Sequence, residues 1–241
     1  ADWMPGILNH RGYSMDRVSS QMTLGAEGIF GIPLGVAATF VFIFVLFGAF
    51  LEVTGAGKFF IDLAYAATGR QRGGPAKASV IASAGMGSIS GSAIANVVTT
   101  GAFTIPLMKR LGYKPPQAGG IEAAASTGGQ IMPPLMGAGA FLMSEFTQVP
   151  YVDIVLASIF PALLYFGAVY LLVHLAAVKQ GLTGLPASEL PRVRTVLAEG
   201  WHFLVPLLAL VALLVAGYSP MRVGFYAIVT IALAAAARAL F

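Results

Sequence analysis

The sequence predicts an all-α integral membrane protein, and its composition, hydropathy and long uncharged segments support that class. Of the 241 residues, 57% are hydrophobic and 10% are charged, whereas an ordinary soluble domain carries about 25% charged residues. The mean hydropathy is +0.82. With 14 basic and 10 acidic side chains, the chain cannot cover the surface of a soluble domain of this size. Most soluble enzymes, disordered chains and nucleic-acid binders are therefore excluded.

The first 74 residues divide into two predicted parts. Residues 1–28 form a segment outside the membrane, and residues 29–74 form a scaffold helix and an arm helix. Residues 1–28 mix charged and aromatic side chains with scattered apolar ones, which indicates a periplasmic segment with a short interfacial helix. Residues 29–51 are uncharged, and a helix of this length is about 35 Å long, enough to cross a membrane core of about 30 Å. Residues 58–67 are too short to cross and predict an interfacial arm helix.

Residues 75–147 contain two interrupted segments, and the first, 75–110, has the pattern of a re-entrant helical hairpin. Two arms, each about 20 Å long as helix and therefore too short to cross, flank a small, polar stretch between Gly85 and Asn96. Both outer ends are basic, and the positive-inside rule places both in the cytoplasm. Such a hairpin is tolerated at membrane depth only where protein or a watery cavity surrounds its tip.

The second part, 117–147, predicts one crossing that is broken at its middle. The first half ends at 127–130 in a Thr-Gly-Gly-Gln run. Pro133 and Pro134 then interrupt the helix, because proline lacks a backbone N–H and clashes with the preceding turn. The second half follows and ends near acidic residues, on the side opposite to the basic loops.

The remaining residues, 148–241, predict further transmembrane helices around a cytoplasmic loop at 179–198. Residues 154–173 are uncharged, and 203–217 and 223–241 form two more apolar segments. The basic clusters all fall on one side of this path, which makes the predicted topology self-consistent and places the N-terminal segment outside.

The hairpin tip and the break supply the oxygen atoms that hard cations prefer. An unwound helix exposes carbonyls that can bind a cation, and a half-helix N-terminus can face an anion. The predicted ion-binding residues are Ser88, Ser90, Gly91, Ser92, Asn96, Thr127, Gly128 and Gly129. The predicted substrate-binding residues are Ser92, Asn96, Thr99, Gln130 and Pro133. The alternative is that these small residues only let helices pack closely; two interrupted segments in one chain favour a midplane binding site.

Two long runs resemble a known family. They are ISGSAIANVVTTGAFTIPLMKR at 89–110 and EAAASTGGQIMPP at 122–134. Both resemble the large membrane subunit of TRAP transporters (tripartite ATP-independent periplasmic transporters), in the TAXI type whose permease is often a fused polypeptide. The resemblance implies that 88–96 form the tip of the first hairpin and that 127–134 form the facing cleft.

The same resemblance implies a function and a set of partners. It implies ion-driven import of a small organic acid by an elevator motion, with sodium as the usual coupling ion and the proton as the alternative. The expected partners are a periplasmic substrate-binding protein, a small membrane domain or subunit, and the lipid bilayer of the bacterial inner membrane. The chain resembles one inverted repeat, so we expect the second-repeat half to come from elsewhere.

Glu122 has two interpretations. A carboxylate within a crossing is costly unless it pairs or faces a cavity, so Glu122 is a candidate proton carrier. Alternatively, it lies near the cytoplasmic rim, close to Lys114, and snorkels or pairs there; the residue spacing favours this second interpretation.

The main alternative to an importer is a passive channel or pore-forming scaffold, because re-entrant hairpins also line channels. An enzyme is not predicted, because an intramembrane enzyme needs a nucleophile with a base or two paired carboxylates. The chain has 3 isolated His and no Cys, so we expect no transition metal and no cofactor other than the coupling ion. We expect no nucleic-acid partner.

Overall fold

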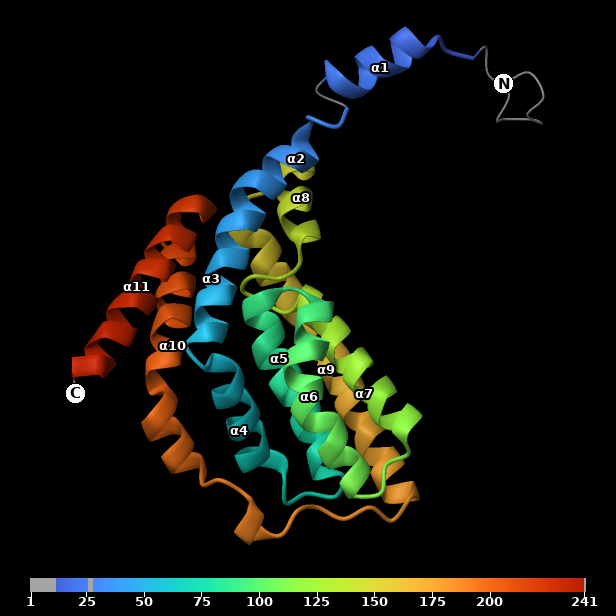
Figure 1. Ribbon diagram of the computed structural model, residues 1–241, viewed down its shortest axis with the longest axis vertical. Helices are drawn as coiled ribbons and strands as arrows, with labels where there is room; N and C mark the ends of the chain where they lie inside the picture. The colour runs from blue at the N-terminus through green and yellow to red at the C-terminus, as the bar shows by residue number, and fades with distance from the viewer. Residues whose placement is uncertain (1–11, 26–27, 241) are drawn as a thin grey trace.

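The protein is a bundle of helices without strands over the described residues, 12–25 and 28–240 of a computed structural model (Figure 1). Within this part of the chain, four stretches are long and apolar enough to cross a membrane: Ile32–Val53, Tyr151–Lys179, Ala187–Val215 and Pro220–Arg238. The predicted class, an all-α integral membrane protein, is confirmed.

The N-terminal segment contains the short helix expected there, α1 (Met15–Thr23). It begins after Ser14, whose hydroxyl accepts a hydrogen bond from the Arg17 N–H at 3.3 Å and so caps the first turn. Residues 1–11 and 26–27 of the predicted segment lie outside the described residues. The interfacial position of α1 stays a prediction.

The predicted scaffold crossing begins a little later than the pattern indicates. It consists of α2 (Ile32–Val36), a π-helical turn η2 (Ala37–Val41) and α3 (Phe42–Val53), which follow one another without a break. Pro33 lies in the first turn of α2, where its missing N–H removes no helical hydrogen bond.

The predicted arm helix is α4 (Ala56–Thr68), which follows Gly55 in a left-handed conformation (φ 103°). One face of α4 is buried: Phe59 packs against Phe203 with 5.7 Å between ring centroids, and Gly57 lies against Thr99 and Met86. Because of these contacts, α4 packs between α10 and the hairpin (Figure 1). It is part of the helical body rather than a separate surface helix.

The predicted helical hairpin is present as α5 (Gly74–Ser90) and α6 (Ala93–Arg110), while its re-entrant position in the membrane stays a prediction. Its arms are longer than expected, 17 and 18 residues, or about 26 and 27 Å. The helices continue through the small residues, so the expected irregular stretch from Gly85 to Asn96 is reduced to Gly91 and Ser92. Ser88, Ser90 and Asn96 are helical, which corrects the expectation of an unwound tip of that length.

The predicted break in the helix at 117–147 is also present, while its crossing of the membrane stays a prediction. The chain runs from α7 (Pro115–Thr127) through a 3-10 turn, η3 (Gly128–Ile131), and an irregular stretch at 132–137 to α8 (Ala138–Thr147). The Pro133–Pro134 peptide bond is cis. The break therefore lies where the Gly and Pro pattern predicts it.

The C-terminal region contains α9 (Tyr151–Lys179), α10 (Val193–Val215) and α11 (Pro220–Leu240). The connection after α9 covers 180–192 and includes a short 3-10 turn, η4 (Ala187–Glu189). The predicted loop at 179–198 is thus too long, because α10 continues into charged residues at its N-terminus that the hydropathy pattern excludes.

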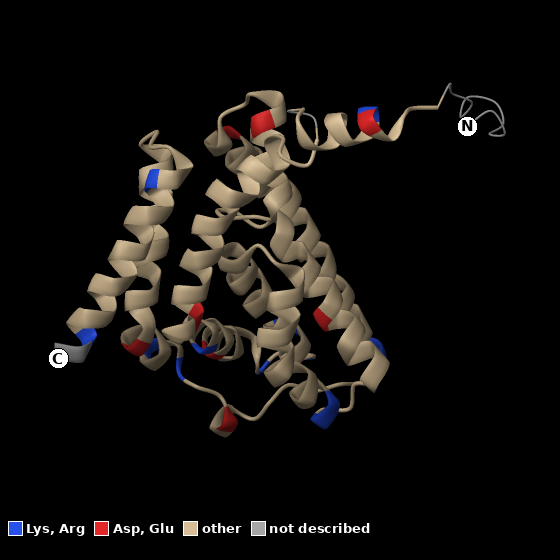
Figure 2. Ribbon diagram, turned by 45° about the horizontal axis from the view of Figure 1, so that its top comes forward, with Lys and Arg blue, Asp and Glu red and all other residues tan. Residues whose placement is uncertain are grey.

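The charge distribution agrees with a membrane protein. Figure 2 shows most Lys, Arg, Asp and Glu residues near the ends of the helices, with a wide band of other residues between them. The basic connections meet at one end: the Leu185 N–H donates to the Gly69 carbonyl at 2.9 Å, and Arg110 pairs with Glu189. Large apolar side chains point outward along α9, among them Phe160 and Leu172 at 70% and 66% exposed.

Candidate functional site

The hairpin tip lies directly against the break. Gly91 has φ 59°, and a Cβ there would lie 1.8 Å from the Met136 carbonyl oxygen. A Cβ on Gly87 would lie 2.3 Å from the Cα of Gly129. Only glycine permits backbones to approach this closely, so the structure brings together the two segments that the sequence singles out.

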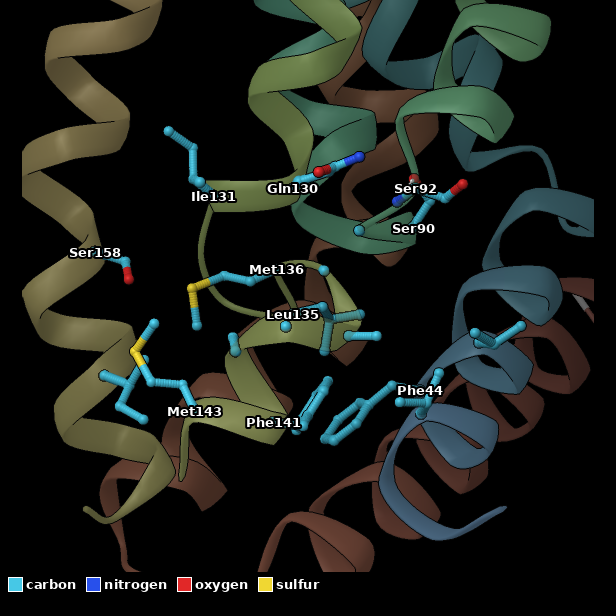
Figure 3. A pocket seen from close by; sticks show the side chains of 18 of the residues that line it. Phe44, Ser90, Ser92, Gln130, Ile131, Leu135, Met136, Phe141, Met143 and Ser158 are labelled. Carbon is cyan, nitrogen blue, oxygen red and sulfur yellow. Dashed lines mark hydrogen bonds between the residues drawn. The ribbon is translucent and has the colours of Figure 1, made fainter. Parts of the chain in front are cut away.

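A cavity of about 680 Å³ opens at this junction, between α3, the hairpin tip, the break, α8 and α9. Its polar side chains are those of Ser90, Ser92, Gln130 and Ser158, and no charged residue lines it (Figure 3). The remaining lining is apolar and includes Phe44. A cavity of this size with a few placed polar groups suits a small ligand.

The predicted site residues that line the cavity are Ser90, Gly91, Ser92 and Gln130. The Ser92 hydroxyl caps α6 by accepting from the Ala95 N–H at 3.3 Å. The Ser90 hydroxyl accepts from the Ser92 N–H at 3.4 Å. Both hydroxyls keep lone pairs toward the cavity, and so the tip offers oxygen atoms to a cation.

Other predicted residues lie beside the cavity lining. Asn96 is fully buried and donates from Nδ2 to the Ser83 carbonyl at 2.9 Å. Gly128 and Gly129 pack closely: a Cβ on the first would lie 2.6 Å from the Tyr165 ring, and one on the second 2.7 Å from Gly87. Pro133 belongs to the irregular stretch at 132–137.

Three predicted hydroxyl ligands bond to their own helices. Ser88 donates to the Gly85 carbonyl at 2.7 Å, and Thr127 donates to the Ala123 carbonyl at 2.7 Å. The Thr99 hydroxyl lies 2.9 Å from the Ala95 carbonyl and 2.8 Å from Glu52 Oε1 on α3. Their roles as ion or substrate ligands stay predictions.

The rim interpretation of Glu122 is wrong. Its side chain is 0% exposed, while Lys114 is exposed at the start of α7, and Glu122 forms no ion pair within the described residues. The helix faces of α5 and α6 cover the carboxylate, so it bonds to hydroxyl groups instead of reaching water. Five hydroxyls surround it: those of Ser79, Ser83, Thr100, Thr104 and Ser126.

These five residues are absent from the sequence-based site, although the sequence contains a signal for them. Ser79 and Ser83 lie four positions apart on α5, as do Thr100 and Thr104 on α6, and Ser126 follows Glu122 by the same interval on α7. Residues four apart share a helix face. Two hydroxyl pairs, on α5 and α6, and the single hydroxyl of Ser126 on α7 thus meet around one carboxylate; we call these five residues the hydroxyl cage.

Helix α9 fixes the break through two tyrosines that sequence reasoning also misses. The Tyr151 hydroxyl lies 2.6 Å from the Leu135 carbonyl and 3.0 Å from the Pro134 carbonyl. The Tyr165 hydroxyl donates to the Ala124 carbonyl at 2.7 Å. The Tyr151 ring also stacks on Phe141 of α8 at 4.5 Å. Carbonyls that the break leaves without helical partners are satisfied in this way.

A multi-pass helical membrane protein whose hairpin tip and broken helix enclose a ligand-sized cavity has the architecture of a membrane transport protein. The family model described as "Tripartite ATP-independent periplasmic transporter, DctM component" matches residues 9–238. The chain therefore belongs to this family, that of the TRAP transporter large permeases. This is a transporter family and not an enzyme family, as predicted.

Individual relatives agree with this membership. The chain is 32% identical to the C4-dicarboxylate TRAP transporter large permease protein DctM of Pseudomonas aeruginosa, over 73% of this chain and 40% of that protein. It is 33% identical to the 2,3-diketo-L-gulonate TRAP transporter large permease protein YiaN of Escherichia coli, over 38% of this chain and 21% of that protein. It is also 32% identical to the uncharacterized protein YgiK of Salmonella typhimurium, over 48% and 25%. The aligned part thus spans two fifths or less of each relative.

Proposed function

We propose that the chain forms one repeat of a permease that imports a small organic anion, driven by a cation gradient. The junction of tip and break around a cavity of about 680 Å³ carries this proposal. Secondary transporters place coupled sites where interrupted helices meet at membrane depth. Binding of the cation organises the tip, and by linkage each ligand then raises the affinity of the other equally.

Sodium is the proposed cation at the tip. Ser90 and Ser92 line the cavity with their hydroxyl groups, and the helical backbone is interrupted there, at Gly91 and Ser92 between α5 and α6. Hydroxyl and carbonyl oxygens are ligands that hard cations prefer. Neutral ligands leave the positive charge of the ion available to a carboxylate beside it.

A carboxylate is the proposed substrate class. No charged residue lines the cavity, but α6 and α8 begin there, next to Ser92 and Gly137. Helix N-termini favour negative charge through the unpaired N–H groups of their first turn. The names of the relatives, which mention C4-dicarboxylates and 2,3-diketo-L-gulonate, support a small organic acid.

A complete permease must cover the outer face of the hairpin. On α6, Ile94 and Val98 are 80% and 69% exposed beside the tip, and irregular backbone is tolerated in the hydrocarbon region only under protein cover. The second inverted repeat is the proposed cover. A periplasmic substrate-binding protein and a small membrane subunit complete the proposed assembly. We propose that this assembly is of TAXI type and lies in the bacterial inner membrane. Its transport domain moves by an elevator mechanism.

Uptake into proteoliposomes tests this proposal. The proteoliposomes contain the full permease that includes this chain, together with its small subunit and its binding protein. With succinate and 2-oxoglutarate as first probes, uptake is expected to saturate and to depend on sodium. Ser90→Ala is expected to raise the sodium concentration for half-maximal uptake several-fold, because one oxygen ligand is lost. The matched control is Ser88→Ala, since that hydroxyl bonds to Gly85 on its own helix.

Two results would contradict the proposal. Flux that is independent of sodium and does not saturate would indicate the passive channel instead. An identical sodium curve for Ser90→Ala and the wild type would remove the tip from the cation site.

A further inference from the structure

The hydroxyl cage is separate from the cavity and has a chemistry of its own. Glu122 Oε2 lies 2.6 Å from the Ser79 hydroxyl and 2.5 Å from that of Thr104. Oε1 contacts the Thr100 hydroxyl, with those of Ser126 and Ser83 at 3.2 and 3.3 Å. A fully buried carboxylate is expensive in a membrane protein and marks a function by default.

Hydroxyl partners permit both protonation states of a carboxyl group. A hydroxyl both donates and accepts, and its proton rotates without movement of the oxygen. The cage can therefore donate to an ionised Glu122, and one of its oxygens can accept from a neutral Glu122. A Lys or Arg partner, in contrast, stabilises only the ionised form.

No such cationic partner is present in the described structure. Lys77 on α5 donates from Nζ to Gln71 Oε1 at 2.9 Å and lies 5.1 Å from the centre of the Tyr170 ring. At the far end of α6, Arg110 pairs with Glu189. The titratable groups that α9 carries toward this side are Tyr165, Tyr170 and His174, and none of them bonds to Glu122.

One further group near the cage is a phenol without a partner. Tyr65 on α4, outside the four spanning stretches, is 7% exposed, and its hydroxyl has no hydrogen-bond partner among the described residues. Burial, and then the negative charge of Glu122, raise the pKa of Tyr65. The Tyr65 ring packs in one cluster with Ala78 and Ala82 on α5, the helix that also carries Ser79 and Ser83 of the cage.

The proton is the cation that fits the cage as it stands. The hydroxyl oxygens touch the carboxylate directly at hydrogen-bond distances, and Glu122 does not line the cavity at the tip. A sodium ion would have to separate these contacts, whereas a proton needs no additional space.

The cage is connected to the tip and break through Thr100. Its single hydroxyl proton has competing acceptors: Glu122, and the Asn96 carbonyl at 2.7 Å. Asn96 Nδ2 bonds to Ser83 of the opposite arm and lies 3.4 Å from the position of a Cβ on Gly129. A neutral Glu122 competes less strongly for this proton than an ionised one, so protonation of Glu122 favours the bond from Thr100 to the Asn96 carbonyl.

We infer that Glu122 binds and releases a coupling proton, and that Thr100 and Asn96 transmit this change to the junction of tip and break. The carboxylate takes up one proton from the outer side to become a carboxylic acid, and returns it on the cytoplasmic side. This inference rests on the proposed function and names a second coupling ion for it.

The test compares uptake with exchange in the reconstituted permease. Glu122→Gln keeps the shape and neutral charge of the protonated side chain but cannot release a proton. We expect uptake driven by an inward proton gradient to fall to background, while exchange of labelled for unlabelled 2-oxoglutarate without a gradient is retained. Glu122→Asp is expected to keep gradient-driven uptake, and Glu145→Gln, a carboxylate outside the cage, serves as the control.

Each outcome decides the inference. If Glu122→Gln still accumulates substrate on a proton gradient, or loses exchange while remaining folded and monodisperse, Glu122 is not the proton carrier. If it does not fold, Ser126→Ala decides: loss of one donor to the carboxylate is expected to shift the pH profile of uptake to higher pH, and an unchanged profile overturns the inference.

Uptake by the wild-type permease distinguishes failure of this inference from failure of the proposed function. Saturable uptake that follows sodium and ignores a pH gradient overturns the role of Glu122 and leaves the proposed function intact. Absence of saturable uptake removes the proposed function and the inference with it.

Discussion

At the residue scale, the hydroxyl side chains fall into two groups. Many bond to the carbonyl four residues earlier in their own helix, such as Thr68 to Ala64 and Thr147 to Met143, which is the default for Ser and Thr in membrane helices. The five hydroxyls of the cage all contact Glu122, although those of Thr100 and Thr104 also lie 2.7 and 3.0 Å from the carbonyls four residues earlier. The second group indicates chemistry, because three helices converge to supply it.

Sequence reasoning locates the tip residues but not the cage. Gly91 and Pro133 carry local backbone signals that one sequence can reveal, whereas the partner of a hydroxyl depends on how helices pack. Glu122 illustrates this difference: its distance along the chain from Lys114 favours the rim, but helix packing buries it. The spacing of four between polar residues was the available signal, and it became decisive only with three helices considered together.

Tyr151 gives a stability prediction at this scale. Tyr151→Phe removes the hydrogen bond to the carbonyls of the break and keeps the ring stack on Phe141, so we expect a loss of about 1 kcal/mol. Thermal denaturation of the purified permease in detergent measures it, with Tyr226→Phe as the control because that side chain is 46% exposed. Equal melting temperatures for the two variants would contradict a role of Tyr151 in holding the break.

At the scale of elements, close backbone contact joins the hairpin to the broken helix. The contact between Gly87 and Gly129 leaves no room for a side chain on either residue. Because α5 runs without interruption to Ser90, the arm is a rigid rod that presents the tip at one fixed position. The irregular backbone is limited to the few residues that line or adjoin the cavity.

The existence of these elements could be predicted from sequence, but their ends could not. Charge at both outer ends with a Gly/Ser tip identifies the hairpin, and the Gly and Pro runs identify the break. The length of the irregular tip is overestimated because small residues such as Gly87 suit tight helix packing as well as unwinding. The loop at 179–198 is overestimated because hydropathy does not detect the charged first turns of α10.

Substitution of the contact glycine tests the element scale. Gly129→Ala forces the break away from α5, so we expect destabilisation by about 1–3 kcal/mol and loss of uptake. Gly120→Ala in the preceding helix is the matched control, because no atom lies within 4 Å of its Cβ position; there we expect a gain of about 0.5–1 kcal/mol. Wild-type stability and uptake in Gly129→Ala would show that the contact is not required.

At the scale of the whole molecule, this chain bounds the cavity at the tip and break on one side but not on the other. The irregular backbone at the tip requires a cover within the membrane. Membership of the large-permease family, together with alignment to two fifths or less of the relatives, supports a second repeat as that cover. Composition and hydropathy predict the membrane class, whereas the cover of the tip belongs to the proposed assembly.

The central claim is that the tip and break enclose a watery ligand site inside the membrane. Because the chain contains no Cys, single cysteines at Ser90 and Val98 can be compared in membranes that contain a permease otherwise free of cysteine. A thiol reacts as the thiolate, which requires water. We predict that a hydrophilic thiol reagent modifies Ser90→Cys and that sodium with 2-oxoglutarate slows this reaction. We expect Val98→Cys to stay unmodified, although Val98 is 69% exposed in the isolated chain. An unreactive Ser90→Cys, or reactivity that neither ligand alters, would contradict the claim.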